Sequence, residues 1–483
     1  MTYEPVIGLE VHAQLATNTK IFCACSPLFG GDPNSHGCPV CLGLPGALPV
    51  LNRQVVELAI RMALAVGCRI QPRSRFLRKN YFYPDLPKGY QISQFQSNEE
   101  MPLATGGSIE VPTGDGSMRR INLTRIHMEE DAGKSIHEES FIASGESFVD
   151  VNRCGVPLIE IVSEPDIATS DEAFHYLTRL HQVLIYTGVS EGDMEKGHMR
   201  IDANVSIRPV GTSALGTKVE VKNVNSFRNC QRAIDLEIDR QIALLETGGT
   251  IQQATMLFDP DRNQLRAMRT KEDSDDYRYF PDPDLVPVVV DDAWIAKVRE
   301  QVPELPEAKR VRFARDFSLS ADQVDVLISS RPMADYFEAT VSAGATPKAA
   351  ANWLQGEVMR LLNEKKIQIA DLKITPIFLA QLLGLIQEGT ISGNMARKVF
   401  DEMAESGQSP KAIVESQGLG QISDSDVLDA IVDRIFAENP SESERYRGGD
   451  KKLVGFFMGQ IMKASKGQAN PQRVNQILRE KLG

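Results

Sequence analysis

The period of the hydrophobic pattern changes once along the chain, near residue 290. Before Val290, apolar and polar residues alternate in short runs separated by Gly, Pro and Asp, which predicts β-strands joined by turns. From Asp291 onward the apolar residues recur at helical spacing, for example over 349–365, 376–388 and 424–438. The pattern therefore predicts an α+β fold, in which a mainly antiparallel-sheet cradle precedes a helical region.

Breaks in the helical region predict a further domain boundary. Residues 406–410, Ser-Gly-Gln-Ser-Pro, combine a glycine that can end a helix with a proline that cannot continue one. A chain of 483 residues is long enough for about three domains. We therefore expect a cradle domain over 1–290, a helical domain over 291–407 and a small helical tail domain over 408–483.

The composition indicates a globular protein. Hydrophobic residues make up 42% and charged residues 24% of the chain, which excludes collagen-like and wholly disordered classes. No run approaches the roughly 18 apolar residues of a membrane span. Residues 1–5 carry neither the basic nor the apolar segment of a signal peptide. We expect a cytoplasmic protein with no membrane contact.

Charge is unevenly distributed near the C-terminus. The net charge of −12 argues against unspecific adhesion to nucleic acid. However, residues 401–446 hold eleven acidic and three basic side chains, whereas 447–483 hold eight basic and two acidic ones. A basic segment of this kind is a candidate site for a polyanion. A solvated pair of amphipathic helices explains the same clustering, so both interpretations stay open.

Four of the seven cysteines form two close pairs: Cys23, Cys25, Cys38 and Cys41. Two such pairs around a loop can supply four thiolates to one tetrahedral Zn²⁺. Four sulfur ligands leave no open position, so a structural zinc is predicted rather than a catalytic one. Unliganded thiols are the alternative.

Polar side chains share one face of several predicted strands. In the strand 5–14, apolar residues alternate with Glu10 and His12. The strands 199–208 and 218–222 likewise present the side chains of Arg200, Asp202, Glu220 and Lys222. A fourth stretch, 125–131, ends in three acids that include Glu129 and Glu130. Carboxylates beside fixed cations suit Mg²⁺ and phosphate chemistry, although an antiparallel sheet with one solvated face gives the same pattern.

The loop 78–91 is dense in aromatic and basic residues, among them Lys79 and Lys88. Such a loop can stack a flat ring and hold an anion, or it can be a packed surface loop.

The standard nucleotide-binding motifs are missing from the sequence. Residues 132–135 resemble the end of a P-loop, but position 128, where its first glycine would stand, is Met128. No G-x-G-x-x-G opens a helix, so a nucleotide would need a different kind of site.

Several segments together resemble the B subunits of the aspartyl/glutamyl-tRNA amidotransferases, along essentially the whole chain. These segments are 6–12, 38–46, 80–94, 127–135, 150–158, 218–226, 276–281 and the tail around 470–471. The resemblance implies that ATP phosphorylates the side-chain carboxylate of glutamate or aspartate misloaded on tRNA, and that ammonia then displaces the phosphate. It also implies two protein partners: an amidase-type glutaminase, the A subunit, which supplies the ammonia, and a small C subunit.

The resemblance and the alternation together suggest roles for individual residues. Candidate catalytic residues and Mg²⁺ ligands are Glu10, His12, Glu129, Glu130, Asp202 and Glu220. Candidate ATP-phosphate contacts are Lys79, Lys88, Arg200 and Lys222. Candidate tRNA-backbone contacts are Lys451, Lys452, Lys463, Lys466 and Arg473. His12 alternatively orients the substrate carboxylate or is a structural histidine.

Two further functions stay open beside the amidotransferase. The first is a zinc-stabilised RNA-binding adaptor without enzymatic activity, whose acidic sheet face is merely solvated. The second is a metal-dependent phosphohydrolase that uses the same carboxylates.

Overall fold

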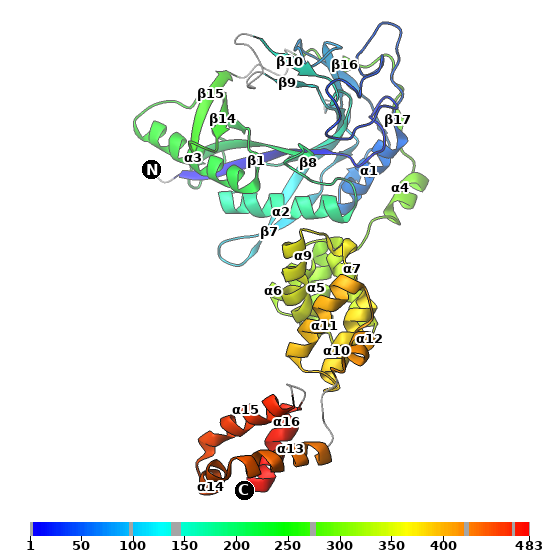
Figure 1. Ribbon diagram of the computed structural model, residues 1–483. Coiled ribbons are helices and arrows are strands. Elements are labelled where there is room, and N and C mark those ends of the chain that lie inside the picture. The colour runs from blue at the N-terminus through cyan, green and yellow to red at the C-terminus, as the bar shows by residue number, and fades with distance from the viewer. Residues whose placement is uncertain are drawn as a thin grey trace. The chain divides into compact units, whose positions relative to one another are not determined.

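The computed structural model describes residues 3–95, 100–136, 146–270, 277–419, 425–465 and 469–482, without the side chains of 269–270, 425–426, 471–472 and 482. The chain forms two compact units, 1–306 and 307–483 (Figure 1). The first unit contains a large sheet with helices, and the second is helical. This agrees with the α+β fold that the change of period predicts.

The sheet of the first unit runs in the order β15-β14-β13-β12-β1-β11-β8-β5-β4-β16. Its strands are β1 (Tyr3–Gln14), β4 (Leu77–Asn80), β5 (Tyr90–Ser93), β8 (Met118–Glu130), β11 (Pro157–Ser163), β12 (Met199–Pro209), β13 (Val219–Lys222), β14 (Ala254–Asp259), β15 (Gln264–Thr270) and β16 (Phe280–Pro281). β13 and β14 are parallel, whereas the long central strands pair antiparallel. Short strands β2 (Arg69–Ile70), β6 (Ala104–Thr105) and β7 (Ser108–Pro112) extend the sheet around β8.

One face of this sheet is apolar and covered by helices. Ile7, Leu9 and Val11 of β1 are buried in a core that also includes residues of α1 (Arg53–Ala65), α2 (Ser170–Tyr186) and α3 (Phe227–Glu246). Fully burying a side chain of this size contributes about 1.5–3 kcal/mol. The helices therefore fix which face of β1 points inward, and Glu10 and His12 must point to the opposite face.

The first unit extends beyond the boundary expected at residue 290. α4 (Asp292–Arg299) packs on the core of the sheet unit, where Val298 is fully buried and Trp294 half-buried. The compact unit ends at Pro306. The change of period at 290 thus marks a change of secondary structure, whereas the packing changes later.

The second unit has two apolar cores. The first lies among α5 (Pro306–Phe317), α6 (Ala321–Leu327), α7 (Arg331–Ser342), α8 (Pro347–Trp353), α9 (Met359–Lys365), α10 (Pro376–Gln387), α11 (Gly393–Ser406) and α12 (Pro410–Gln417). The second lies among α13 (Ser425–Glu438), α14 (Pro440–Arg447), α15 (Val454–Ala464) and α16 (Pro471–Leu482). Ile413 and Val414 of α12 belong to the first core, so this core continues past the boundary expected at 407.

Candidate active site

A cavity of about 350 Å³ lies on the polar face of the sheet. Side chains from β1, β8, β11, β12 and β13 line it, and Tyr277 and Tyr279 complete the wall. The strand register explains why residues distant in sequence meet here, because Glu10 lies opposite Asp202 and Asn204 lies opposite Glu220. Two groups of potential metal ligands face this cavity.

The first group is an acidic triad of Glu10, Asp202 and Glu220, whose carboxylate oxygens lie within 4.8 Å of one another. The Lys222 ammonium lies 2.5 Å from Asp202 and 3.4 Å from Glu220. Burial lowers the pKa of Lys222, but the charges of Asp202 and Glu220, the hydrogen bond to Asp202 and the charge of Glu10 together outweigh burial and raise the pKa. The sequence pattern predicted that these three acids share one face, and the structure brings them together. Three carboxylates at this spacing form an oxygen donor set suited to a hard divalent cation.

Neighbouring side chains orient the acidic triad. Asn204 donates a hydrogen bond of 2.9 Å to Glu10, and the Thr255 hydroxyl donates one of 2.9 Å to Glu220. Each bond leaves further oxygen lone pairs of the same carboxylate for another partner. Thr255 lies beside Glu220 because β14 pairs with β13 in parallel. Alternation within a single strand does not reveal which strands are neighbours, so the sequence did not indicate this contact.

The second group consists of His12, Glu129 and Glu160. The His12 Nε2 atom lies 3.1 Å from Glu160 and 3.4 Å from Glu129. Burial lowers the pKa of His12, but its hydrogen bond to Glu160 and the nearby carboxylates outweigh this and raise the pKa to about 9. In turn, the charge of His127 and the hydrogen bond to His12 outweigh burial and hold the pKa of Glu160 well below its usual range.

Glu160 is the main site residue that the sequence analysis missed. It lies on β11 between Ile159 and Ile161, which are both buried in the core. A single acid between apolar residues in a strand of alternating burial was the available signal, since it must face away from the core. His127, Arg125 and Ser93 also line the cavity and were not singled out.

Aromatic and basic side chains form the rest of the wall. The Lys79 ammonium lies 4.8 Å from the centre of the Tyr277 ring, and the rings of Phe95 and Tyr279 stack at 4.5 Å. Arg200, the remaining candidate phosphate contact from these strands, does not line the cavity: it lies opposite His12 on the neighbouring strand and pairs with Asp131 at 2.7 Å. Although burial lowers the pKa of Arg200, Asp131 and the other nearby carboxylates raise it. Lys79 and Lys222 thus line the cavity itself, as the candidate phosphate contacts require.

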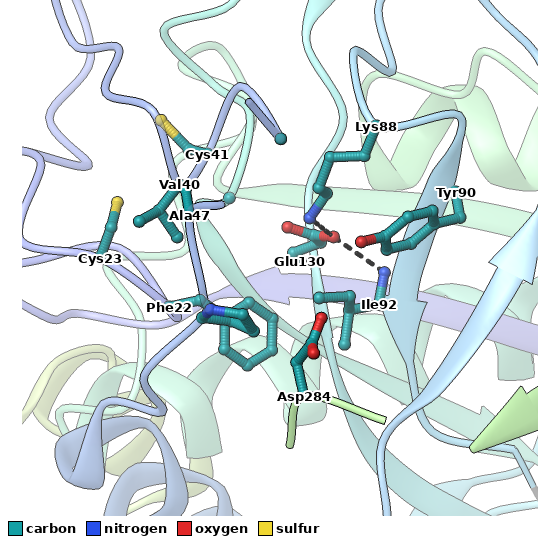
Figure 2. Close-up of a pocket in the computed structure, with 13 residues that line it drawn as sticks. Phe22, Cys23, Val40, Cys41, Ala47, Lys88, Tyr90, Ile92, Glu130 and Asp284 are labelled. Atoms are coloured by element: carbon teal, nitrogen blue, oxygen red, sulfur yellow. Dashed lines mark hydrogen bonds and ion pairs between the residues drawn. The ribbon is translucent and has the colours of Figure 1, made fainter. Parts of the chain in front are cut away.

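The structure separates Glu130 and Lys88 from this cavity. Successive residues of a strand face opposite sides, so Glu129 points to the acidic cavity and Glu130 to the other face of β8. There Glu130 forms an ion pair with Lys88 and accepts a hydrogen bond of 2.8 Å from the Ile92 amide (Figure 2). Both residues line a separate pocket of about 50 Å³ beside Cys23 and Cys41. Glu130 and Lys88 therefore form a buried ion pair and are not metal or ATP contacts of the acidic cavity, contrary to the expectation from the sequence.

Replacing Lys88 by methionine is expected to destabilise the protein by roughly 3–5 kcal/mol, because it leaves a buried carboxylate without its cation. Burial already raises the pKa of Glu130, with Lys88 opposing that effect. The double variant Lys88→Met/Glu130→Gln should recover much of the loss, and the matched change at the exposed Lys196 should have far less effect. Urea unfolding measures the free energy of unfolding of all three variants. Equal stability of Lys88→Met and Lys196→Met would contradict the assignment.

The four clustered cysteines lie together as the spacing predicts. Their sulfur atoms are all within 4.8 Å of one another, and those of Cys38 and Cys41 are 3.8 Å apart. Zinc bound tetrahedrally to four thiolates at about 2.3 Å would separate the sulfurs by about 3.8 Å. A hydrogen bond from the Cys23 thiol outweighs burial and, with the buried Lys20 ammonium, lowers the pKa of Cys41 to about 4. The donor set therefore fits a structural zinc ion.

The candidate tRNA contacts lie on the C-terminal helices, except for Lys466, which is outside the described residues. Lys451 and Lys452 form the short turn before α15 and are exposed, and Lys463 is exposed in the last turn of α15. Arg473 lies on α16 and bonds Gln476 at 2.8 Å. In the described part of the chain, no helix has the length and apolar content that crossing a bilayer requires.

Two clusters of potential metal ligands therefore lie beside lysine residues on one face of the sheet. Sites of this kind suit a divalent cation together with phosphate. Residues 5–296 match the family described as the GatB/GatE catalytic domain, and residues 335–482 match the GatB domain. The chain belongs to the GatB/GatE family.

Several relatives match along the full length. The B subunit of the aspartyl/glutamyl-tRNA(Asn/Gln) amidotransferase from Geotalea uraniireducens (strain Rf4) is 55% identical over 482 residues, which is 100% of both chains. The subunit of the same name from Geobacter sulfurreducens is also 55% identical over 482 residues, with the same coverage. That of Solidesulfovibrio magneticus is 54% identical over 481 residues, covering 100% of this chain and 99% of the relative.

Proposed function

We propose that this chain is the component of a tRNA-dependent amidotransferase that phosphorylates and amidates glutamate or aspartate misloaded on tRNA. One observation carries the proposal: the acidic triad and the His12, Glu129 and Glu160 group converge in one cavity. Full-length relatives named as amidotransferase B subunits support the choice of substrate. The residues of these two clusters are the proposed Mg²⁺ ligands.

The proposed reaction has two steps. A side-chain oxygen of the aminoacyl residue attacks the γ-phosphorus of ATP while the bond to ADP breaks, which gives an acyl phosphate. Ammonia then attacks the carbonyl carbon, phosphate leaves, and the nitrogen loses a proton to give the amide. In the first step an anionic nucleophile approaches anionic phosphates, so the main barrier is charge repulsion.

The cavity supplies positive charge that would reduce this repulsion. Lys79 and Lys222 line the cavity, and their ammonium groups are the proposed contacts of the phosphoryl oxygens. Mg²⁺ held by the carboxylates would neutralise further phosphate charge. The aromatic wall of Tyr277, Tyr279 and Phe95 would restrict the access of water, which hydrolyses an acyl phosphate.

The relatives' names support a multi-subunit enzyme that acts on charged tRNA. We infer that an amidase-type A subunit supplies ammonia from glutamine and that a small C subunit completes the assembly. We place the reaction in the cytoplasm, where charged tRNA is used. The assembly is tested with glutamyl-tRNA, ATP and glutamine by following the formation of glutaminyl-tRNA. An RNA-binding adaptor would turn over no ATP, and a phosphohydrolase would cleave ATP without charged tRNA.

For the tail, we predict that the triple variant Lys451→Gln, Lys452→Gln and Lys463→Gln binds tRNA more weakly. Each lost phosphate contact should reduce the slope of log affinity against log salt by about 0.7–0.9. The matched control changes three exposed lysines elsewhere in the second unit: Lys348, Lys398 and Lys411. Filter binding at several salt concentrations measures both variants. If the tail variant and the control variant have equal salt slopes, the three tail lysines do not contact tRNA.

A further inference from the structure

We propose that Arg78 and Asn80 of β4 are positioning residues, which hold the segment 277–284 so that its two tyrosines close the wall of the acidic cavity. This inference rests on the proposed function and adds to it a means of keeping the acyl phosphate from water. Lys79 lies between the two residues in the sequence and lines the cavity itself. Arg78 and Asn80 do not line the cavity, so they would act through the segment that they hold.

The segment 277–284 is joined to β4 by a very short strand. β16 consists of Phe280 and Pro281 at the edge of the sheet, and these residues pair with Arg78 and Leu77 of β4. Both residues of β16 are exposed, and a proline cannot donate a hydrogen bond to the ladder. So short a strand needs side-chain contacts to keep a fixed position.

Arg78 holds the part of the segment that follows β16. Its Nε atom donates a hydrogen bond of 2.8 Å to Asp282, and its Nη2 atom donates one of 2.9 Å to Asp284. The Asp282 carboxylate is fully buried, so solvent and salt screen this ion pair little. The Arg78 guanidinium also lies 4.2 Å from the centre of the Tyr90 ring, whose face attracts a cation. The planar guanidinium therefore fixes both the distance and the direction of the bound segment, which a lysine cannot do.

Asn80 holds the part of the segment that precedes β16. Its side-chain amide donates hydrogen bonds to the carbonyl oxygens of Arg278, at 2.9 Å, and Tyr277, at 3.3 Å. Arg278 has a φ of 47°, in the left-handed region that residues with a side chain rarely adopt. Such a conformation persists only where its surroundings enforce it. The Asn80 amide therefore stabilises the turn between Tyr277 and Tyr279.

The two contacts determine where the aromatic wall lies. Tyr277 and Tyr279 line the cavity with their rings edge to face, 6.1 Å apart. Tyr279 stacks on Phe95 at 4.5 Å, and the Lys79 ammonium lies over the Tyr277 ring. Release of 277–284 from β4 would open this wall. It would leave the potential metal ligands in place, because they belong to the strands β1, β8, β11, β12 and β13.

An open wall has a specific chemical consequence. Water would attack the acyl phosphate in place of ammonia, phosphate would leave, and the side-chain carboxylate would form again. The net reaction would be the hydrolysis of ATP to ADP and phosphate without formation of an amide. Loss of either contact should therefore lower the amount of amide formed for each ATP used. Loss of the fold or of a metal ligand would instead lower the rates of phosphate release and amide formation together.

The test measures the phosphate released for each glutaminyl-tRNA formed by the assembled enzyme with glutamyl-tRNA, ATP and glutamine. Asn80→Ala removes one contact without leaving a buried charge unpaired. Arg78→Lys keeps a positive charge for the buried Asp282 and loses the two-pronged contact. Arg266→Gln is the matched control, because Arg266 also joins two strands at an edge of the sheet, pairing with Asp259 at 2.8 Å. That pair lies at the opposite edge and outside the cavity.

The unaltered enzyme should release phosphate and form amide in equal amounts. Asn80→Ala and Arg78→Lys should each raise the ratio of phosphate to amide by about fivefold, the order of effect of one lost hydrogen bond. Arg266→Gln should leave the ratio unchanged. A ratio unchanged in both β4 variants, or raised to the same extent by Arg266→Gln, would overturn the positioning role alone. An unaltered enzyme that releases phosphate without charged tRNA, or forms no amide, would overturn the proposed function as well.

Discussion

Replacing Asp202 by alanine is expected to lower the rate of glutaminyl-tRNA formation by roughly a hundredfold to a thousandfold. Asp202 lies opposite Glu10 and is the carboxylate nearest to Lys222. Its removal takes one of three ligands from the proposed cation and frees Lys222 from its position beside the phosphates. The rate is measured on the assembled enzyme with glutamyl-tRNA, ATP and glutamine. Hydrolysis of glutamine alone is followed in parallel.

A matched control lies on the same pair of strands. Glu4 of β1 pairs with Arg208 of β12 at 2.6 Å, and neither residue lines the acidic cavity. Glu4→Gln should leave amide formation near its original rate, and the tRNA affinity of Asp202→Ala should be unchanged. If Asp202→Ala and Glu4→Gln are equally active, the acidic triad is not the site.

The second large effect concerns the cysteine cluster. Structural zinc contributes an apparent binding free energy of about 10–16 kcal/mol in small zinc domains, so losing one ligand should release the metal and destabilise the segment around it. We expect Cys38→Ser to purify with little zinc and to have a lower free energy of unfolding. Metal analysis and urea unfolding measure the two effects.

Cys230→Ala provides the control for the cysteine variant. Cys230 is also buried, but it lies on α3 outside the cluster. This variant should keep its zinc and lose only the small stability that truncating a buried thiol costs. A Cys38→Ser protein with the zinc content and stability of the unaltered chain would contradict the structural zinc.

The acidic triad could be predicted because period-two alternation and a buried apolar face together fix the direction of each side chain. Ile7, Leu9 and Val11 are buried, so Glu10 must face the other side. The same rule separates Glu129 from Glu130, but three consecutive acids at 129–131 obscure the alternation in the sequence. Applied strictly, the rule would have excluded Glu130 from the site and included Glu160.

Other features depend on information that no single segment contains. Thr255 reaches Glu220 only because β14 pairs in parallel with β13, and Arg200 reaches Asp131 across several strands. The limits of the domains also depend on packing between distant segments. α4 packs on the sheet unit, although its sequence has the same helical pattern as the segments that follow. Periodicity predicts the type of an element, whereas its packing partner is decided by the apolar surfaces of the whole unit.

The central claim is that carboxylates from distant strands bind one divalent cation together with a nucleotide. It is tested most directly by crystals of the assembled enzyme with Mn²⁺ and a non-hydrolysable ATP analogue, measured at a wavelength where manganese scatters anomalously. We predict an anomalous peak within ligand distance of Glu10, Asp202 and Glu220, in contact with the phosphates of the analogue. A nucleotide and manganese bound elsewhere, with the triad in contact with neither, would contradict it.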